Sequence, residues 1–291
     1  MTATPKIWKS LTQVNATDSG PDGVSQGDGQ IVALKDGGYV VVWADNSGGF
    51  NPNGTAVMGQ RYNSAGNKVG GEVHLSTGFP GSVYAPAVTL LGDGSLAVAF
   101  VNEINGDNDI YVRIFSPSLT VGRTDFINTG ATQTVDPSIT ALADGGYAVS
   151  YTVDDAQIAG RTVSISGFPG PQFGASASTH SELATLSNGN FVVVHQGAAG
   201  TIDLEVLTPS AGLAGLASAG FGSDPDVAAL RPLSYARAPV YTGSLCQIAH
   251  PDRRHPDGLH PGGFRSARQA AAYFQKPRTP VTFPPLIHLD L

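Results

Sequence analysis

The 291-residue sequence has little of what several large protein classes require. Its single cysteine, Cys246, excludes an internal disulfide framework. Charged residues make up only 13% of the chain, and no apolar run reaches the roughly 18 residues that a membrane-spanning helix needs. The first residues carry charge without a following apolar core, so we expect no signal peptide there. Glycine and proline, by contrast, number 37 and 20, a turn-rich composition that favours β structure.

Sequence motifs of several common catalytic classes are also missing. There is no G-x-S-x-G nucleophile elbow, no glycine-rich phosphate loop and no dinucleotide-binding fingerprint. Residues 1 to 230 contain 20 acidic and 8 basic side chains, a net charge of −12. This charge argues against nucleic acid as a partner, because nucleic acids are bound through basic side chains.

What the chain does contain is a repeat centred on an Asp-Gly or Asn-Gly pair. A leucine lies two residues before each pair, and an aromatic or histidine ring lies seven residues after its first member. The pairs are Asp36-Gly37, Asp93-Gly94, Asp144-Gly145 and Asn188-Gly189, and the rings are Trp43, Phe100, Tyr151 and His195. Such a pair between two apolar runs predicts a two-residue hairpin turn with positive φ angles. Each copy therefore begins with two antiparallel strands, of which the second is apolar enough to be buried on both faces.

Each copy continues with a polar loop, a half-exposed third strand and a more polar fourth strand. The copies are spaced by 57, 51 and 44 residues, and four-stranded units of this size are typical of β-propeller blades. The sequence therefore predicts an all-β, propeller-like array of four-stranded antiparallel blades, about four plus an incomplete fifth. We expect an N-terminal strand and linker in residues 1 to 30, the blades in residues 31 to 230, and an irregular tail in residues 231 to 291.

The tail differs sharply from the repeats in composition. Arg231 and Pro232 stand where the fifth Asp-Gly pair belongs, and residues 231 to 291 hold 9 of the 20 prolines. With 8 basic and 3 acidic side chains, this Pro/Arg/His-rich segment has a net charge of +5. We interpret it as frame-shifted or disordered. A propeller left open by an unfinished blade exposes strand edges, so we also predict self-association.

The first copy carries a resemblance to a known group of repeats. Its sequence from Leu34 to Thr77, LKDGGYVVVWADNSGGFNPNGTAVMGQRYNSAGNKVGGEVHLST, resembles tandem repeats of large secreted bacterial proteins that often accompany hemolysin-type (RTX) calcium-binding modules. The resemblance implies an extracellular or cell-surface location and a role in binding or adhesion. The calcium-binding nonapeptides of RTX modules are absent, so the resemblance does not carry calcium dependence with it.

The variable loops after the ring position offer candidate metal ligands. Asp45 opens one such loop, and Asp107 and Asp109 lie in the next copy's loop. Carboxylate and carbonyl oxygens are the ligands that calcium prefers, so we name calcium as a candidate cofactor with these three residues as its ligands. The alternative is that the loops are Asx turns, whose side chains bond to their own backbone.

Other recurring or unusual residues have both a structural and a functional interpretation. His195 could act as a base or ligand, or could simply replace the ring of the other copies. Asp154 and Asp155 could share a proton or be ordinary loop acids. The recurring Arg61, Arg113 and Arg161 could form a ring of cations for an acidic ligand, or could pack their stems and pair locally.

We therefore assign no catalytic or cofactor-binding residue from the sequence. The favoured interpretation is a non-catalytic repeat module of a secreted or cell-surface bacterial protein, which binds glycan, protein or calcium through its blade loops. The alternatives are a propeller-class enzyme acting on glycans, as a hydrolase or lyase, and an inactive truncated product. Carboxylates gathered from several blades at the centre of the propeller would favour the enzyme, whereas scattered solvated acids would favour the binding module.

Overall fold

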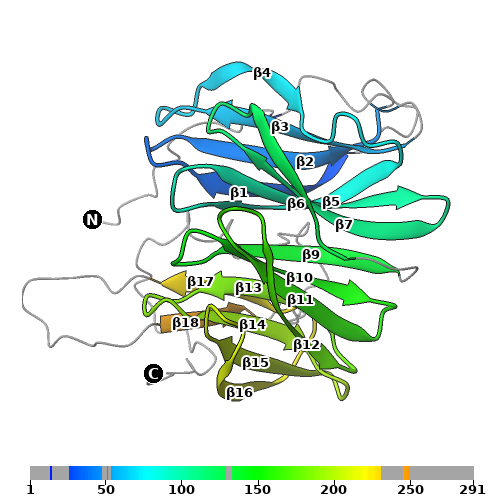
Figure 1. The fold of residues 1–291 in the computed structure, drawn as a ribbon, viewed down its shortest axis with the longest axis vertical. Helices are drawn as coiled ribbons and strands as arrows, with labels where there is room; N and C mark the ends of the chain where they lie inside the picture. The colour runs from blue at the N-terminus through cyan, green and yellow to red at the C-terminus, as the bar shows by residue number, and fades with distance from the viewer. Residues whose placement is uncertain are drawn as a thin grey trace, which may run out of the picture.

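The structure is a computed structural model that describes residues 14, 26–47, 51, 54–128, 133–230 and 245–249. Four antiparallel sheets of four strands follow one another from top to bottom of Figure 1, and a two-stranded sheet follows them in the chain. This confirms the predicted all-β, propeller-like array with an incomplete fifth blade. No helix long and apolar enough to cross a membrane occurs in this part of the chain. Most of residues 1 to 30 and 231 to 291 lies outside the described residues.

The strands of each sheet pair in chain order. The first sheet contains β1 (Gln26–Ala33), β2 (Tyr39–Asp45), β3 (Ala56–Tyr62) and β4 (Lys68–His74). The second contains β5 (Ser82–Leu90), β6 (Leu96–Ile104), β7 (Asp107–Phe115) and β8 (Val121–Phe126). The third contains β9 (Thr134–Ala141), β10 (Tyr147–Val153), β11 (Gln157–Val163) and β12 (Pro169–Ser176). The fourth contains β13 (Thr179–Thr185), β14 (Phe191–Gln196), β15 (Thr201–Leu207) and β16 (Leu213–Phe221). The last pairs β17 (Asp226–Leu230) with β18 (Leu245–Ala249).

The repeated Asp-Gly pair forms a longer turn than the sequence suggests. In the first copy the Gly37 amide donates to the Leu34 carbonyl at 3.2 Å, and the Leu34 amide donates to the Gly38 carbonyl at 2.8 Å. Gly37 has a φ of 82°, whereas Asp36 keeps a negative φ and accepts a hydrogen bond from the Gly38 amide at 2.9 Å. The expected two-residue turn with two positive φ angles is therefore wrong. A tight turn followed by one left-handed glycine forms instead, because the aspartate side chain holds its own loop.

The second strand of each sheet forms the core between neighbouring blades. On β6, Leu96, Val98 and Phe100 pack towards the first sheet, while Ala97 and Ala99 pack towards the third. All five are fully buried. A strand covered on both faces explains the nearly continuous apolar run in the sequence. Burial falls from the second strand to the exposed fourth strand, as expected, but the first strand departs from this order because β1 begins exposed.

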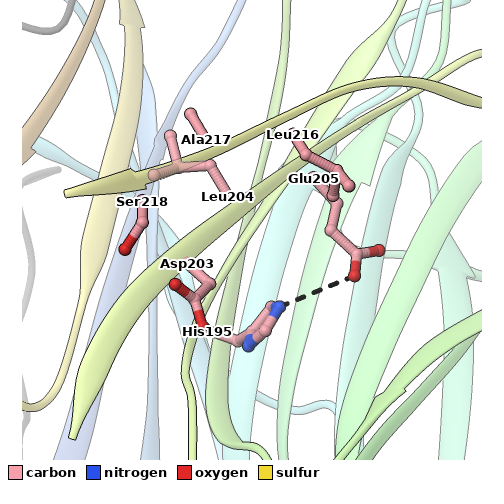
Figure 2. Close-up of a pocket in the computed structure, with 7 residues that line it drawn as sticks. All are labelled: His195, Asp203, Leu204, Glu205, Leu216, Ala217 and Ser218. Carbon is pink, nitrogen blue, oxygen red and sulfur yellow. Dashed lines mark ion pairs between the residues drawn. The ribbon is translucent and has the colours of Figure 1, made fainter. Parts of the chain in front are cut away.

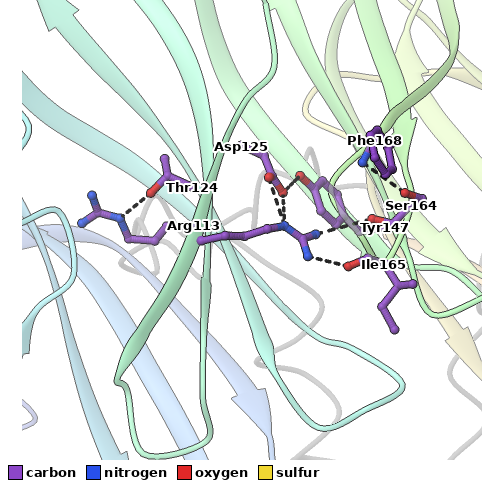
Figure 3. Close-up of polar contacts among 8 residues, drawn as sticks. Arg113, Thr124, Asp125, Tyr147, Ser164, Ile165 and Phe168 are labelled. Carbon is purple, nitrogen blue, oxygen red and sulfur yellow. Dashed lines mark hydrogen bonds and ion pairs between the residues drawn. The ribbon is translucent and has the colours of Figure 1, made fainter.

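A polar contact fixes the third sheet to the outer strand of the second (Figure 3). The buried Tyr147 hydroxyl on β10 donates to Asp125 Oδ2 on β8 at 2.8 Å, and Arg123 Nε lies 3.0 Å from the same carboxylate. Arg123 also donates to the carbonyls of Ser164 and Ile165, in the turn between β11 and β12 of the third sheet. Burial raises the pKa of the Tyr147 hydroxyl, and the Asp125 charge adds to this effect. Tyr147 therefore remains a neutral donor.

We expect the Tyr147→Phe variant to lose about 1.5–3 kcal/mol of unfolding free energy, because the substitution removes a hydrogen bond to a charged group. Tyr151→Phe is the matched control, since Tyr151 is buried on the same strand but its hydroxyl bonds to no described residue. Urea unfolding followed by fluorescence measures both. Equal effects of the two substitutions would contradict the role given to the Tyr147 hydroxyl.

Candidate functional site at the inner strands

The first strands of successive sheets lie side by side in the order β1, β5, β9, β13 and β17. Each copy places one non-glycine residue with a left-handed backbone eight positions before its Asp-Gly, Asn-Gly or equivalent pair. These residues are Asp28, Ala85, Asp136, His180 and Asp224, with φ angles of 53°, 49°, 51°, 50° and 47°. Three of the five are aspartates and one is a histidine. A repeated backbone feature thus presents ionisable side chains from four blades.

The local cause of this conformation is a β-bulge in the first strand. The pairing register shifts between Gly27 and Gln30 on β1, between Tyr84 and Ala87 on β5, and between Thr179 and Glu182 on β13. On β9 the shift falls opposite Ser150 and Thr152. A bulge bends the strand and redirects a side chain, and positive φ in a residue other than glycine is a strain that often marks functional positions.

Asp136 is the best-defined member of the group. Desolvation raises the pKa of its carboxyl, and the negative charges of Asp155, Asp28 and Asp224 raise it further, while His180 opposes them. Asp136 Oδ2 lies 3.8 Å from His180 Nε2, and about half of each side chain is accessible to water. Because the side chain is half exposed, solvent moderates these interactions. The direction is nevertheless clear: like charges and surrounding protein favour the protonated acid.

A tyrosine from the second sheet adjoins this group. Burial raises the pKa of Tyr84 on β5, and the charges of Glu103 and Asp136 add to the effect. Tyr84 therefore presents a neutral hydroxyl in electrostatic range of Asp136. We call Asp28, Tyr84, Asp136, His180 and Asp224 the inner-strand cluster. It combines a carboxyl that favours its proton with other carboxyls and a histidine.

The acids chosen from the sequence as calcium ligands lie elsewhere. Asp45 is buried at the end of β2 and accepts hydrogen bonds from Gln26 Nε2 at 2.9 Å and from the Ser47 amide at 2.8 Å. The Ser47 contact is the Asx turn considered as the alternative. Across the residues that the structure describes, no three His, Cys, Asp or Glu side chains are grouped to hold one metal ion.

Asp107 and Asp109 begin β7 in the second sheet. Asp109 accepts a hydrogen bond from Asn128 Nδ2 at 3.0 Å. Desolvation and the charge of Asp107 raise the pKa of Asp109. Asp45 belongs to a different sheet, so the three acids do not form one centre. Calcium binding at either loop stays a prediction.

The recurring arginines do not occupy equivalent positions. Arg113 and Arg161 pair across the hairpin with Val98 and Val149, whereas Arg61 pairs with Val40, one residue out of register. Since successive residues of a strand point to opposite faces, Arg61 lies on the other face of its sheet. It pairs with Asp36 at 2.6 Å. These placements fit local pairing and packing rather than a ring of cations.

His195 does occupy the ring position, but with polar neighbours that the sequence analysis missed. It is buried on β14, directly opposite Asp203 on β15, and its Nε2 lies 3.8 Å from Glu205 Oε1. Figure 2 shows the three side chains in one pocket. The cross-strand register of the hairpin is the signal that would have found Asp203 and Glu205.

Comparisons with known proteins identify the fold. No family model and no curated protein matches the chain. A protein of unknown function from Dyadobacter fermentans has a similar structure, with a TM-score of 0.54, 11% identity, and coverage of 78% of this chain and 79% of that one. The NanB sialidase of Streptococcus pneumoniae, as a K499G mutant, also gives a TM-score of 0.54, at 8% identity, with 79% of this chain and 57% of that one covered. At these identities the likeness shows the fold.

The comparisons correct the favoured functional interpretation. The GH62 alpha-L-arabinofuranosidase catalytic domain of Coprinopsis cinerea gives a lower TM-score of 0.45 at 13% identity, covering 69% of this chain and 70% of that one. The NanB structure, whose TM-score is above 0.5, is that of an enzyme, a sialidase. The interpretation as a non-catalytic binding module is therefore wrong, and these findings favour the alternative of a propeller-class enzyme. The fold of this chain is a β-propeller.

Proposed function

We propose that the chain is a glycan-acting enzyme of the β-propeller class, a glycoside hydrolase whose reacting groups belong to the inner-strand cluster. The observation that carries the proposal is the raised pKa of Asp136 among Asp28, Asp224 and His180. Hydrolysis of a glycosidic bond uses two carboxyl groups in different protonation states. The inner-strand cluster provides a carboxyl whose raised pKa favours its protonated form, within electrostatic range of the carboxyls of Asp28 and Asp224, and such a pair suits this chemistry.

In this proposal the acids of different blades have different roles. Asp136 gives its proton to the leaving glycosidic oxygen as the C–O bond breaks. The carboxylate of Asp28 or Asp224 takes a proton from the water that adds to the sugar carbon, or attacks that carbon first and is then released by water. Tyr84 and His180 are placed to donate hydrogen bonds to sugar hydroxyls. The similarity in fold to NanB, which is named a sialidase, supports the proposed activity on glycans.

The proposal also includes an extracellular location and calcium as a cofactor. The resemblance to repeats of secreted proteins supports an extracellular site of action, where polymeric glycans are accessible. Calcium at the loops of Asp45, Asp107 and Asp109 would hold loops rather than take part in the reaction. A melting temperature raised by millimolar calcium and returned by a chelator would support that addition.

A panel of aryl glycosides and glycan polymers tests the proposed activity. We expect the purified chain to release aryl alcohol or reducing sugar from at least one substrate, and we expect Asp136→Asn to remove that release. The Asp93→Asn variant is the matched control, since Asp93 lies in a hairpin turn where it accepts a hydrogen bond from the Ser95 amide. The proposal would be contradicted if the unchanged chain and the Asp93→Asn control both failed to cleave any substrate of the panel. Full activity in Asp136→Asn would contradict it as well.

A further inference from the structure

A second polar site lies on the outer strands of the fourth sheet, apart from the inner-strand cluster. It is an open pocket of about 380 Å³ on β14, β15 and β16 (Figure 2). Its polar lining includes His195, Asp203 and Glu205, and its apolar lining includes Leu204 and Leu216. Leu216 is largely exposed. The two carboxylates on one side and the apolar surface beside them give the pocket a negative, amphipathic character.

The equivalent position in two other blades holds a cation belonging to the chain itself. Glu205 pairs with Val193 across its hairpin, just as Arg113 pairs with Val98 and Arg161 pairs with Val149. The second, third and fourth copies thus place arginine, arginine and glutamate at one register position, opposite the valine that lies five residues after the Asp or Asn of the turn. The fourth copy reverses the sign of the charge.

The second sheet shows what the cation does at this position. The guanidinium of Arg113 donates to the carbonyls of Leu75 and Thr77 at 2.8 and 2.9 Å. It also lies over the ring of Phe79, with its central carbon 4.7 Å from the ring centroid. The arginine thereby fills the space between the first and second blades. Glu205 of the fourth sheet is shorter than Arg113. It lines an open pocket at the position where Arg113 fills the space in the second sheet.

His195 independently indicates that the pocket takes a ligand. Only 5% of its side chain is exposed, and neither ring nitrogen has a hydrogen-bond partner among the described residues. Buried polar atoms in proteins nearly always have a hydrogen-bond partner, so two buried ring nitrogens without one require an explanation. A neutral imidazole always has one acceptor nitrogen. An N–H group entering the pocket would satisfy it.

We propose that this pocket binds a small organic cation, a guanidinium or primary ammonium group carried on an alkyl chain. Glu205 and Asp203 supply the opposing charge, and His195 accepts a hydrogen bond from the ligand. Asp203 already accepts one from the Thr201 hydroxyl at 3.0 Å, which holds its carboxylate in place. The alkyl chain packs against Leu216, which is exposed beside Glu205 on the neighbouring strand. The ligand would occupy the place that the Arg113 guanidinium occupies in the second blade.

Isothermal titration of the full chain with agmatine and with pentylamine tests this proposal, using N-butylurea as the uncharged probe. We expect both cations to bind at least about tenfold more tightly than the urea, because charge-assisted hydrogen bonds are about twice as strong as neutral ones. Glu205→Gln keeps the shape and should weaken cation binding by about tenfold or more, which is the effect of roughly 1.4 kcal/mol. Glu205→Arg supplies the cation from the chain and should abolish binding.

Two controls keep the result interpretable. Glu72→Gln removes an acid from β4 of the first sheet and should leave binding unchanged. His195→Phe copies the ring of Phe100, so it should keep the melting temperature while weakening cation binding severalfold. Binding of the urea as tightly as the cations, affinity unchanged in Glu205→Gln, or binding of calcium or zinc ions in preference to the amines would each overturn the proposal.

Discussion

Replacing Phe100 with alanine is expected to lower the free energy of unfolding by about 3–5 kcal/mol, the usual effect of removing a buried aromatic side chain from a core. Phe100 is fully buried on β6. Its ring meets Phe79 edge-on with 5.0 Å between centroids, and Tyr111 at 6.5 Å in a stacked arrangement. It packs among residues of the first and second sheets. The substitution would therefore leave a cavity between two blades.

Phe168→Ala is the matched control for this prediction. Phe168 is 73% exposed, so its removal should change the unfolding free energy by no more than about 0.5 kcal/mol. Urea unfolding monitored by circular dichroism gives both values. Since repeat proteins draw their stability from contacts between neighbouring units, loss of one inter-blade ring should also broaden the transition. A small effect of Phe100→Ala, equal to that of Phe168→Ala, would contradict the inter-blade core described here.

The Asp136→Asn substitution is expected to have the largest effect on activity. If Asp136 is the proton donor, its amide cannot protonate the leaving group, and kcat should fall by about 10²–10⁴-fold. The reaction of the unchanged chain should slow as the pH rises through the raised pKa of Asp136, because the acid is then ionised. An aryl glycoside with a good leaving group should lessen the loss.

Stability distinguishes a catalytic role from damage to the fold. The folded-state pKa of Asp136 is raised, so its carboxyl favours the folded state when protonated, and this contribution is lost as the pH rises through the folded pKa. Asparagine carries no charge at any pH. At neutral pH the Asp136→Asn variant should therefore melt at the same temperature as the unchanged chain or higher. A lower melting temperature together with lost activity would instead indicate a structural role.

The repeats could be predicted from the sequence because their signals are local. Leu34, Gly37 and Trp43 lie within ten residues of one another, and each type recurs because turn geometry and core packing demand it. The number and order of strands follow from these turns. The turn type was mistaken because the aspartate side chain holds Gly38 through a hydrogen bond, which allows a longer loop.

The inner-strand cluster could not be found from the same signals. Its repeated property is a backbone bulge rather than a residue type, and the positions hold Asp, Ala and His in different copies. One signal was visible: proline follows the bulged residue in three copies, at Pro86, Pro137 and Pro225. Proline lacks an amide donor and fits a bulge where the ladder is interrupted. The convergence of Asp28, Asp136 and Asp224 depends on how the blades are arranged, which no single copy specifies.

The pocket of the fourth sheet is an intermediate case. Its polar residues lie on two strands of one hairpin, so pairing His195 with Asp203 requires only the register. Glu205 becomes informative when it is compared with Arg113 at the same register position in the second copy. Arg61 and Arg113 both lie on the third strand of their copies, yet their pairing registers differ by one residue, so the two side chains point to opposite faces.

Titration of the aspartate carboxyl carbons by NMR tests directly whether the inner-strand cluster forms one electrostatic site. We expect the pKa of Asp136 to lie above the ordinary aspartate value, to fall in Asp28→Asn and in Asp224→Asn, and to rise in His180→Ala. These directions require the four side chains to share one electrostatic environment. An ordinary pKa for Asp136 that none of the three substitutions changes would contradict the inner-strand cluster, and with it the proposed enzyme.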